Sequence, residues 1–293
     1  MKTLRYTFDT EIHFSEPVVE HTFVLRCQPH RRPGIRVLEE RLDVEPEMRY
    51  MRQVDAFGNH LAAGRAAEPH TRMRYLSCGL VEVDPDRPQA AGAVAAGTAG
   101  QATPGSWTAA HPIYCYPSAL TTPDDALLCF AGECADMLGC GRSHATREDG
   151  SEQAPEEKIW GKERLSHTVH ERMEYVPGST HVRTTAAQAF AARAGVCQDF
   201  SHVLICVLRE LGVPARYVSG LALGEGQTHA WVEAFVDGSW KGFDPTRDQL
   251  VDDTYIPLAV GRDWTDCPIE QGSFIGAAQQ TQTVYMTVTE AKS

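Results

Sequence analysis

Three residues in the second half of the chain have side chains that could together break an amide bond: Cys197, His229 and Asp244. A cysteine thiolate attacks carbonyl carbon atoms, an imidazole can carry the proton, and a carboxylate can hold that imidazole in one tautomer. We predict that Cys197 is the nucleophile, that His229 is its base and that Asp244 orients the base. The elements that carry these residues must bring them within reach of one another.

The cysteine is expected in the first turn of a helix. Apolar residues recur at helical spacing after it, at Phe200, Val203, Leu204, Val207, Leu208 and Leu211. Gly212 ends this predicted helix, and Pro214 prevents its continuation. Because the N-terminus of a helix stabilises negative charge, this position favours the reactive thiolate of Cys197. Cys206, inside the same helix among apolar neighbours, has the pattern of a structural cysteine.

The histidine and the aspartate are expected on two neighbouring strands. Residues 229–236 have a strand pattern, residues 237–239 (Asp-Gly-Ser) turn the chain, and residues 240–244 return it. In an antiparallel pair joined by an even-numbered loop, His229 and Asp244 project from the same face as direct or diagonal neighbours. An odd-numbered loop without a bulge would separate them.

Four blocks in this half of the chain resemble the bacterial transglutaminase-like family. They read Gly-Val-Cys-Gln-Asp-Phe-Ser-His at 195–202, Leu-Gly-Val-Pro-Ala-Arg-Tyr-Val-Ser-Gly at 211–220, Thr-His-Ala-Trp-Val-Glu at 228–233 and Trp-Lys-Gly-Phe-Asp-Pro-Thr at 240–246. The resemblance is clearest over residues 158–276. It implies a papain-like α+β core with a Cys-His-Asp triad, whose motif positions correspond to Cys197, His229 and Asp244.

The resemblance implies a thioester intermediate but leaves its acceptor open, because the family contains cross-linking enzymes, cysteine proteases and amidases. The leading hypothesis is a thiol hydrolase acting on peptide or isopeptide amides, with no cofactor. The alternatives are a protein-glutamine gamma-glutamyltransferase, in which an amine resolves the thioester, and a catalytically silent binding module with this fold. The backbone N–H of Cys197 is the expected first oxyanion donor. The second donor is left unassigned, since the side chain of Gln198 can point elsewhere.

The first part of the chain is predicted to be rich in β-structure. Residues 4–83 contain several extended, turn-punctuated segments that suggest short strands in a sandwich or small barrel. They also resemble the N-terminal region of the bacterial proteins. Residues 84–105 are rich in Ala and Gly and are expected to form a linker. We therefore expect a β-rich domain at 1–105 and a catalytic domain at 106–293.

Helices are expected at 123–137, 158–175 and 185–194, the last of them stopped by Gly195 in a left-handed conformation. Near the first of these lie Cys115, Cys129, Cys134 and Cys140, with His144 nearby. Their spacing lacks the Cys-x-x-Cys pair typical of structural zinc, so we expect free thiols and no metal.

Composition restricts the classes of partner. The formal net charge of −12 disfavours a nucleic-acid ligand, since binding to phosphates rests on clustered Lys and Arg. No apolar run approaches the roughly 20 residues that span a bilayer, and the N-terminus lacks a signal-peptide pattern. We expect a cytoplasmic protein with reduced cysteines that acts on a peptide or protein without a membrane partner. The oligomeric state is not predicted.

Overall fold

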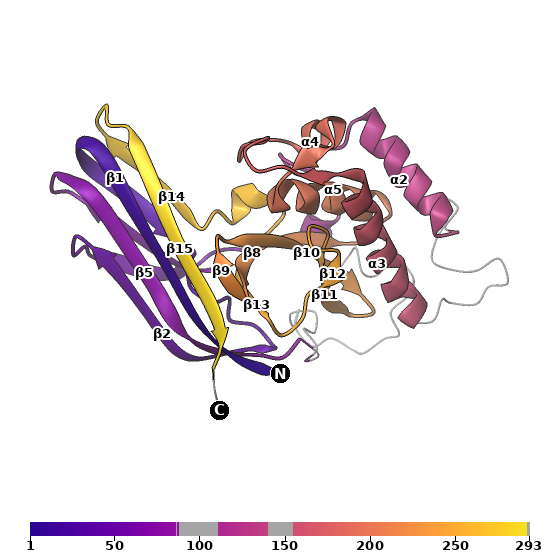
Figure 1. The fold of residues 1–293 in the computed structure, drawn as a ribbon, viewed down its shortest axis with the longest axis horizontal. Helices are drawn as coiled ribbons and strands as arrows, with labels where there is room; N and C mark the ends of the chain where they lie inside the picture. Colours follow the sequence, from indigo (N-terminus) through magenta and orange to yellow (C-terminus); the bar gives the residue numbers. More distant parts are fainter. Residues whose placement is uncertain (86, 88–110, 140–154, 292–293) are drawn as a thin grey trace.

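The structure is a computed structural model that describes residues 1–85, 87, 111–139 and 155–291, with the backbone alone for 155–160. Long strands form one side of the molecule, and a second sheet with the helices forms the other (Figure 1). The expected linker after residue 87 and the boundary at residue 105 lie outside the described residues, as do Cys140 and His144. The fold is of the mixed α+β class, as predicted.

The larger sheet has eight strands drawn from both ends of the chain. Its main order is β2-β5-β1-β15-β9; β14 and β4 also pair with β1, and β3 pairs with β4. The strands are β1 (Lys2–Leu25), β2 (Ile35–Glu45), β3 (Tyr50–Val54), β4 (His60–Ala66), β5 (His70–Val83), β9 (Gly224–Gly226), β14 (Glu270–Ile275) and β15 (Gln280–Glu290). Figure 1 shows β15, in yellow, beside β1, in indigo.

The expectation of only short strands in the N-terminal region is wrong for β1, which runs for 24 residues. Its first half pairs with β5 and β15, and its second half pairs with β4 and β14. The register shifts between His13 and Val18, around Pro17, where the sequence suggests a break. The strand continues past this point because new partners take over its backbone hydrogen bonds.

The smaller sheet has the order β12-β11-β10-β8-β13 and carries two of the predicted site residues. Its strands are β8 (Ala215–Ala222), β10 (His229–Val236), β11 (Ser239–Asp244), β12 (Gln249–Leu250) and β13 (Tyr255–Gly261). Residues 224–226, between β8 and β10, form β9, which pairs with β15 in the larger sheet. The chain therefore crosses from one sheet to the other and back just before His229.

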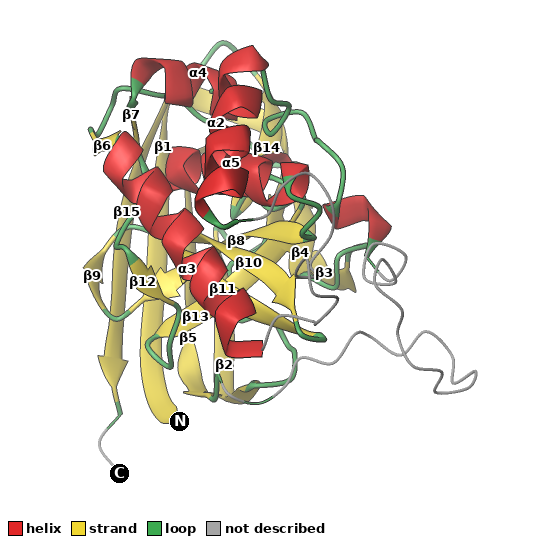
Figure 2. Cartoon of the chain, turned by 90° about the vertical axis from the view of Figure 1, so that its right-hand side faces the viewer, coloured by secondary structure: helices red, strands yellow, loops and turns green. Residues whose placement is uncertain are grey.

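Helices cover one face of the smaller sheet (Figure 2). They are α2 (Asp125–Met137), α3 (Pro155–Arg172), α4 (Ala186–Ala192) and α5 (Cys197–Glu210), with short 3-10 turns η1 (Pro112–Tyr114) and η2 (Trp264–Asp266). The central helix α5 contacts α2, α3 and α4 as well as β8 and β10. Because it is enclosed in this way, every residue from Asp199 to Arg209 is buried.

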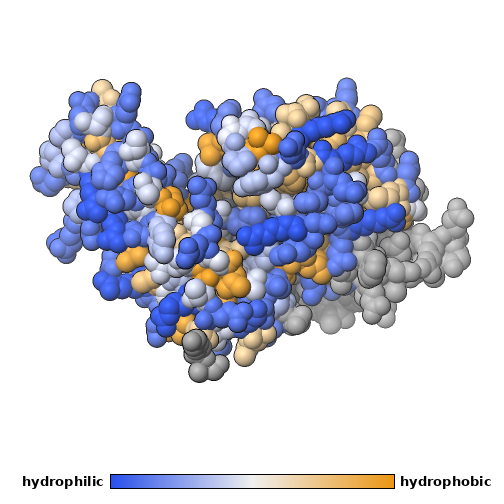
Figure 3. Space-filling model, in the orientation of Figure 1, coloured by the Kyte–Doolittle hydropathy of each residue, from blue (hydrophilic) through white to orange (hydrophobic). Residues whose placement is uncertain are grey.

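Two cores hold these layers together. One lies between α5 and the smaller sheet, around Phe200, Leu204 and Val232. The other lies on the larger sheet and includes Leu221 and Ile256 from β8 and β13, so both sheets share it. Burying each such side chain contributes roughly 1.5–3 kcal/mol. The surface is hollowed between the strand-rich side and the helical side (Figure 3).

The helices lie close to the predicted ranges, with two exceptions. The helix expected at 158–175 ends at Arg172, and residues 174–175 form a short strand instead. Asp124 caps α2 and Thr185 caps α4, each accepting a backbone N–H from the first turn. The predicted left-handed stop at Gly195 is wrong: Arg193 adopts that conformation, with φ 51°, and Gly195 lies in the short strand β7 (Ala194–Gly195). This strand pairs in parallel with β6 (Glu174–Tyr175). A Cβ on Gly195 would lie 2.5 Å from the Cβ of Asp199. Close packing against Asp199, and not backbone conformation, is therefore the reason that this position requires glycine.

Among the described residues, no helix has the length and apolar character needed to cross a membrane.

Candidate active site

Cys197 is the first residue of α5, as predicted, and its side chain is partly exposed. The turn before it is held by Asp199, whose Oδ2 accepts the backbone N–H of Val196 at 2.8 Å and the hydroxyl of Thr180 at 2.6 Å. Asp199 therefore has the structural role that its position in the first turn favours. The N–H groups of a first helical turn lack intrahelical acceptors, so they favour negative charge beside the thiol.

His229 and Asp244 meet on one face of the β10–β11 hairpin. Val236 pairs with Ser239, so the loop between them has two residues, Asp237 and Gly238, both with positive φ. This even-numbered loop matches the geometry in which the two side chains share a face. The register makes His229 and Asp244 diagonal neighbours, and Nε2 of His229 lies 2.6 Å from Oδ2 of Asp244. The carboxylate therefore fixes Nε2 as the protonated nitrogen.

The remaining oxygen positions of Asp244 are also occupied, which fixes the orientation of the carboxylate. Oδ1 accepts the backbone N–H groups of Thr246 and Arg247, at 3.0 and 3.1 Å. The hydroxyl of Tyr255 donates to Oδ2 at 2.8 Å, and Nε2 of Gln249 donates to that hydroxyl at 2.7 Å. Asp244 is fully buried, and these bonds with His229 hold its pKa below the ordinary value despite burial.

Sequence reasoning missed Tyr255 and Gln249. Tyr255 begins β13, which pairs with β8 and not with β11, so no hairpin register connects it to Asp244. Gln249 lies on β12 and pairs with Asp244 on β11. A strand as short as β12 shows no alternation of apolar and polar residues by which it could be recognised in the sequence. The only available signal was proximity in sequence, since both residues lie within 11 positions of Asp244.

His229 interacts with Cys197 as well as with Asp244. Burial lowers the pKa of His229, but hydrogen bonds to Asp244 and Cys197 outweigh burial and raise it to about 9. Since Nε2 faces Asp244, Nδ1 is the nitrogen available to the thiol. The structure thus brings all three predicted side chains together, with the imidazole between the carboxylate and the thiol. Such an arrangement can stabilise a thiolate–imidazolium pair.

The strand that carries His229 is anchored by a buried ion network. Glu233 of β10 accepts from Arg216 of β8 at 2.8 Å and from Arg32 of the N-terminal region at 2.9 Å. Burial raises the pKa of Glu233, but the two arginines reverse this and lower it to about 2. Arg216 is therefore paired with a buried acid. Its guanidinium also lies 4.1 Å from the ring centroid of Trp240.

Residues beside Cys197 in the sequence have other partners. Nε2 of Gln198 donates to the carbonyl of Val182 at 3.2 Å, so this amide already has a hydrogen-bond partner. His202 is fully buried and accepts the backbone N–H of Trp264 at 3.2 Å, which gives it a structural role. The exposed side chains of Tyr175 and Val182 belong to the segment that precedes α4.

Within the described ranges, no group of three or more His, Cys, Asp or Glu side chains could hold a metal ion. Cys129 is exposed on α2, Cys134 is buried on the same helix, and Cys115 follows η1. The arrangement at Cys197 needs neither a metal nor a cofactor for acyl chemistry, because thiol, imidazole and carboxylate supply nucleophile, proton carrier and orienter.

Family models match two parts of the chain. Residues 145–245 match the transglutaminase-like superfamily, and residues 4–82 match the bacterial transglutaminase-like N-terminal region. An uncharacterized protein of Mycobacterium tuberculosis is 30% identical over 285 residues, which cover 92% of this chain and 86% of the relative. One of Mycobacterium leprae is 26% identical over 301 residues and covers 99% of both chains.

A solved structure has the same fold over the whole chain. The crystal structure of a "putative cysteine protease" from Cytophaga hutchinsonii superposes with a TM-score of 0.70 at 21% sequence identity. The match covers 100% of this chain and 93% of that one. The similarity therefore extends over the larger sheet as well as the helices and the smaller sheet.

Proposed function

This chain belongs to the transglutaminase-like superfamily, and from that premise we propose that it is a thiol hydrolase that cleaves peptide or isopeptide amides through a thioester on Cys197. In this proposal His229 carries the proton and Asp244 orients the imidazole. One observation carries it above the others: the imidazole of His229 is bonded to a buried carboxylate on one side and interacts with the Cys197 thiol on the other.

The first half of the proposed reaction forms the thioester. The Cys197 thiolate attacks the amide carbonyl carbon, and the oxygen takes the negative charge. The backbone N–H of Cys197 stabilises this oxyanion from the N-terminus of α5. When the C–N bond breaks, the imidazolium of His229 gives its proton to the departing nitrogen, and a free amine leaves. Asp244 stabilises the imidazolium before this transfer and keeps Nδ1 directed at the thiol.

The second half releases the acyl group. Neutral His229 takes a proton from water, and the resulting hydroxide attacks the thioester carbonyl carbon. The C–S bond then breaks, which releases a carboxylic acid and restores the thiolate–imidazolium pair. A primary amine in place of water would give a new amide, the outcome expected of a transglutaminase. Hydrolysis is preferred here because the fold matches, over the whole of this chain, a structure described as a "putative cysteine protease".

A cytoplasmic location is part of the same proposal. All eight cysteines within the described residues are unpaired, which is typical of proteins kept in a reducing compartment. Cell fractionation with detection of the full-length chain tests this location. Recovery in an exported fraction would contradict it.

The decisive experiment compares wild type, Cys197→Ala and Cys206→Ala on a peptide library, with and without a primary amine. Mass spectrometry distinguishes cleavage, deamidation and amine incorporation. We expect cleavage by wild type and by the Cys206→Ala control, and none by Cys197→Ala. If amine incorporation exceeds cleavage, the protein is a transferase and not a hydrolase. Activity that survives in Cys197→Ala would overturn both assignments.

A further inference from the structure

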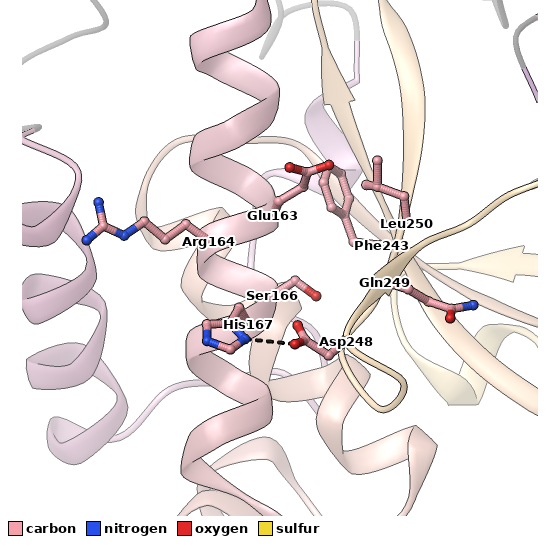
Figure 4. A pocket seen from close by; sticks show the side chains of 8 residues that line it. All are labelled: Glu163, Arg164, Ser166, His167, Phe243, Asp248, Gln249 and Leu250. Atoms are coloured by element: carbon pink, nitrogen blue, oxygen red, sulfur yellow. Dashed lines mark hydrogen bonds and ion pairs between the residues drawn. The ribbon is translucent and has the colours of Figure 1, made fainter.

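A cavity of about 360 Å³ lies between α3 and the turn that joins β11 to β12 (Figure 4). Residues on both elements line it, and those that matter here are Glu163, Ser166, His167, Phe243, Asp248 and Leu250. Neither Cys197 nor His229 is among the lining residues. Successive strand residues project from opposite faces, so Phe243 faces this cavity while Asp244 faces the proposed catalytic site. The cavity is therefore a separate feature.

Ser166 presents an unsatisfied polar group to this cavity. The residue is 3% exposed, and its Oγ has no hydrogen-bond partner among the described residues. Figure 4 shows the side chain directed from α3 toward the turn that carries Asp248. A buried hydroxyl normally bonds a backbone carbonyl, another side chain or a bound molecule. The unpaired hydroxyl of Ser166 therefore indicates that a polar ligand binds in this cavity.

The charges around Ser166 specify the sign of that ligand. Oδ2 of Asp248 lies 2.8 Å from Nδ1 of His167, so this carboxylate already has a hydrogen-bond partner. The carboxylate of Glu163 has no ion pair or hydrogen bond within the described residues. Figure 4 shows the guanidinium of Arg164 directed away from the other lining side chains. One negative charge is thus left without a partner, and it favours a cation.

The apolar side chains that line the cavity favour a cation that carries an alkyl chain. The ring of Phe243 lines the cavity, and the side chain of Leu250, 41% exposed, lies on the strand beside it. An ammonium group offers three donors, enough for Ser166 Oγ and the carboxylate of Glu163 together. We propose that this cavity binds a primary alkylammonium group, carried either by a lysine side chain or by a free amine. The methylene groups pack against Phe243 and Leu250.

The cavity shares its wall with the residues that hold Asp244. The turn supplies the backbone N–H groups of Thr246 and Arg247 to Asp244, and Gln249 holds Tyr255 against the same carboxylate. A bound ammonium thus lies against the segment that fixes the proposed orienter. An effect of the bound ammonium group on catalysis rests on the proposed function. The binding of the ammonium group to this cavity does not depend on that function.

Binding is measured by calorimetry on full-length Cys197→Ala protein, which removes turnover from the measurement. The probes are n-butylammonium, Nα-acetyl-lysine N-methylamide and n-butanol as the uncharged control. We expect saturable binding of both ammonium compounds and none of n-butanol. Tighter binding of the lysine compound assigns the cavity to a lysine side chain, and tighter binding of n-butylammonium assigns it to a free amine.

Variants locate the binding in this cavity. Glu163→Gln is expected to weaken ammonium binding at least tenfold and Ser166→Ala several-fold, while Arg164→Ala leaves it unchanged because that guanidinium points away. Thermal unfolding of each variant checks that the fold is retained. No saturable binding, equal binding of n-butanol, or full affinity in Glu163→Gln would overturn the proposal. If wild type cleaves peptides but the protein binds no ammonium compound, the ammonium site is wrong and the proposed function stands. If the ammonium compounds bind but no peptide is cleaved, the proposed function is wrong and the ammonium site stands.

Discussion

The hydroxyl of Tyr255 donates its hydrogen bond to Oδ2 of Asp244, the same oxygen that accepts from His229. The two donors approach that atom at 2.8 and 2.6 Å, and Asp244 is fully buried. Tyr255 therefore limits how the carboxylate can rotate, and through it how the imidazole is aimed at Cys197. It acts as a positioning residue, because it touches neither the thiol nor the expected substrate.

Tyr255→Phe is expected to lower kcat for amide cleavage roughly tenfold with little change in KM, because orientation of the base is needed mainly in the transition state. The matched control is Tyr50→Phe, which removes a phenol that donates to the carbonyl of Leu42, far from the site. Steady-state kinetics on both variants provide the measurement. Equal kcat values for Tyr255→Phe and wild type would show that the hydroxyl does not position Asp244.

The raised pKa of His229 is expected to set the alkaline limit of the proposed amide cleavage. In the proposed reaction the imidazolium protonates the leaving amine, and its pKa is about 9, so kcat/KM is expected to fall as pH rises through about 9. The same shift affects stability. Because the folded pKa lies above the ordinary value of about 6.5, the stabilisation is complete below that pH and is lost as pH rises through about 9.

The measurements for His229 are a pH–rate profile from pH 6 to 10 and urea unfolding at pH 6, 8 and 10. His229→Ala should remove the cleavage activity, and it should also remove the part of the stability change that belongs to this titration. A wild-type rate that continues to rise beyond pH 9.5 would be incompatible with a protonated His229 in catalysis.

Iodoacetamide near neutral pH should label Cys197 much faster than Cys206. Cys197 is partly exposed at the N-terminus of α5, whereas Cys206 is 2% exposed and burial raises its thiol pKa to about 12. Peptide mapping by mass spectrometry gives both rates in one reaction. Urea-unfolded protein is the control, since the two rates should converge there. Equal rates in the folded protein would remove the basis for Cys197 as the nucleophile.

Arg32→Ala is expected to lower the free energy of unfolding by about 2 kcal/mol, because it leaves the buried Glu233 with Arg216 as its remaining strong counter-charge. The control is Arg36→Ala, which breaks an exposed pair with Glu82 and should cost well under 1 kcal/mol. Urea unfolding at pH 7 compares the two variants. A loss no larger for Arg32→Ala than for Arg36→Ala would mean that this network does not anchor β10.

The sequence by itself determined the local elements of the site and the residues on them. The apolar spacing after Cys197 predicted α5, since a helix enclosed by packing must repeat its apolar positions every three or four residues. The short polar segment at 237–239 predicted the hairpin, and the period of two along each strand placed His229 and Asp244 on one face. Both inferences rest on interactions between residues close in sequence, which is why they could be made.

Only the tertiary structure decided what surrounds these elements. Tyr255 reaches Asp244 from a strand that pairs with β8, and Arg32 reaches Glu233 across 201 positions. The length of β1, the place of Gly195 in β7 and the pairing of β9 with β15 each depend on a partner distant in the chain. Such contacts are set by the packing of whole layers, and no periodicity within one segment records which distant segment will satisfy its hydrogen bonds.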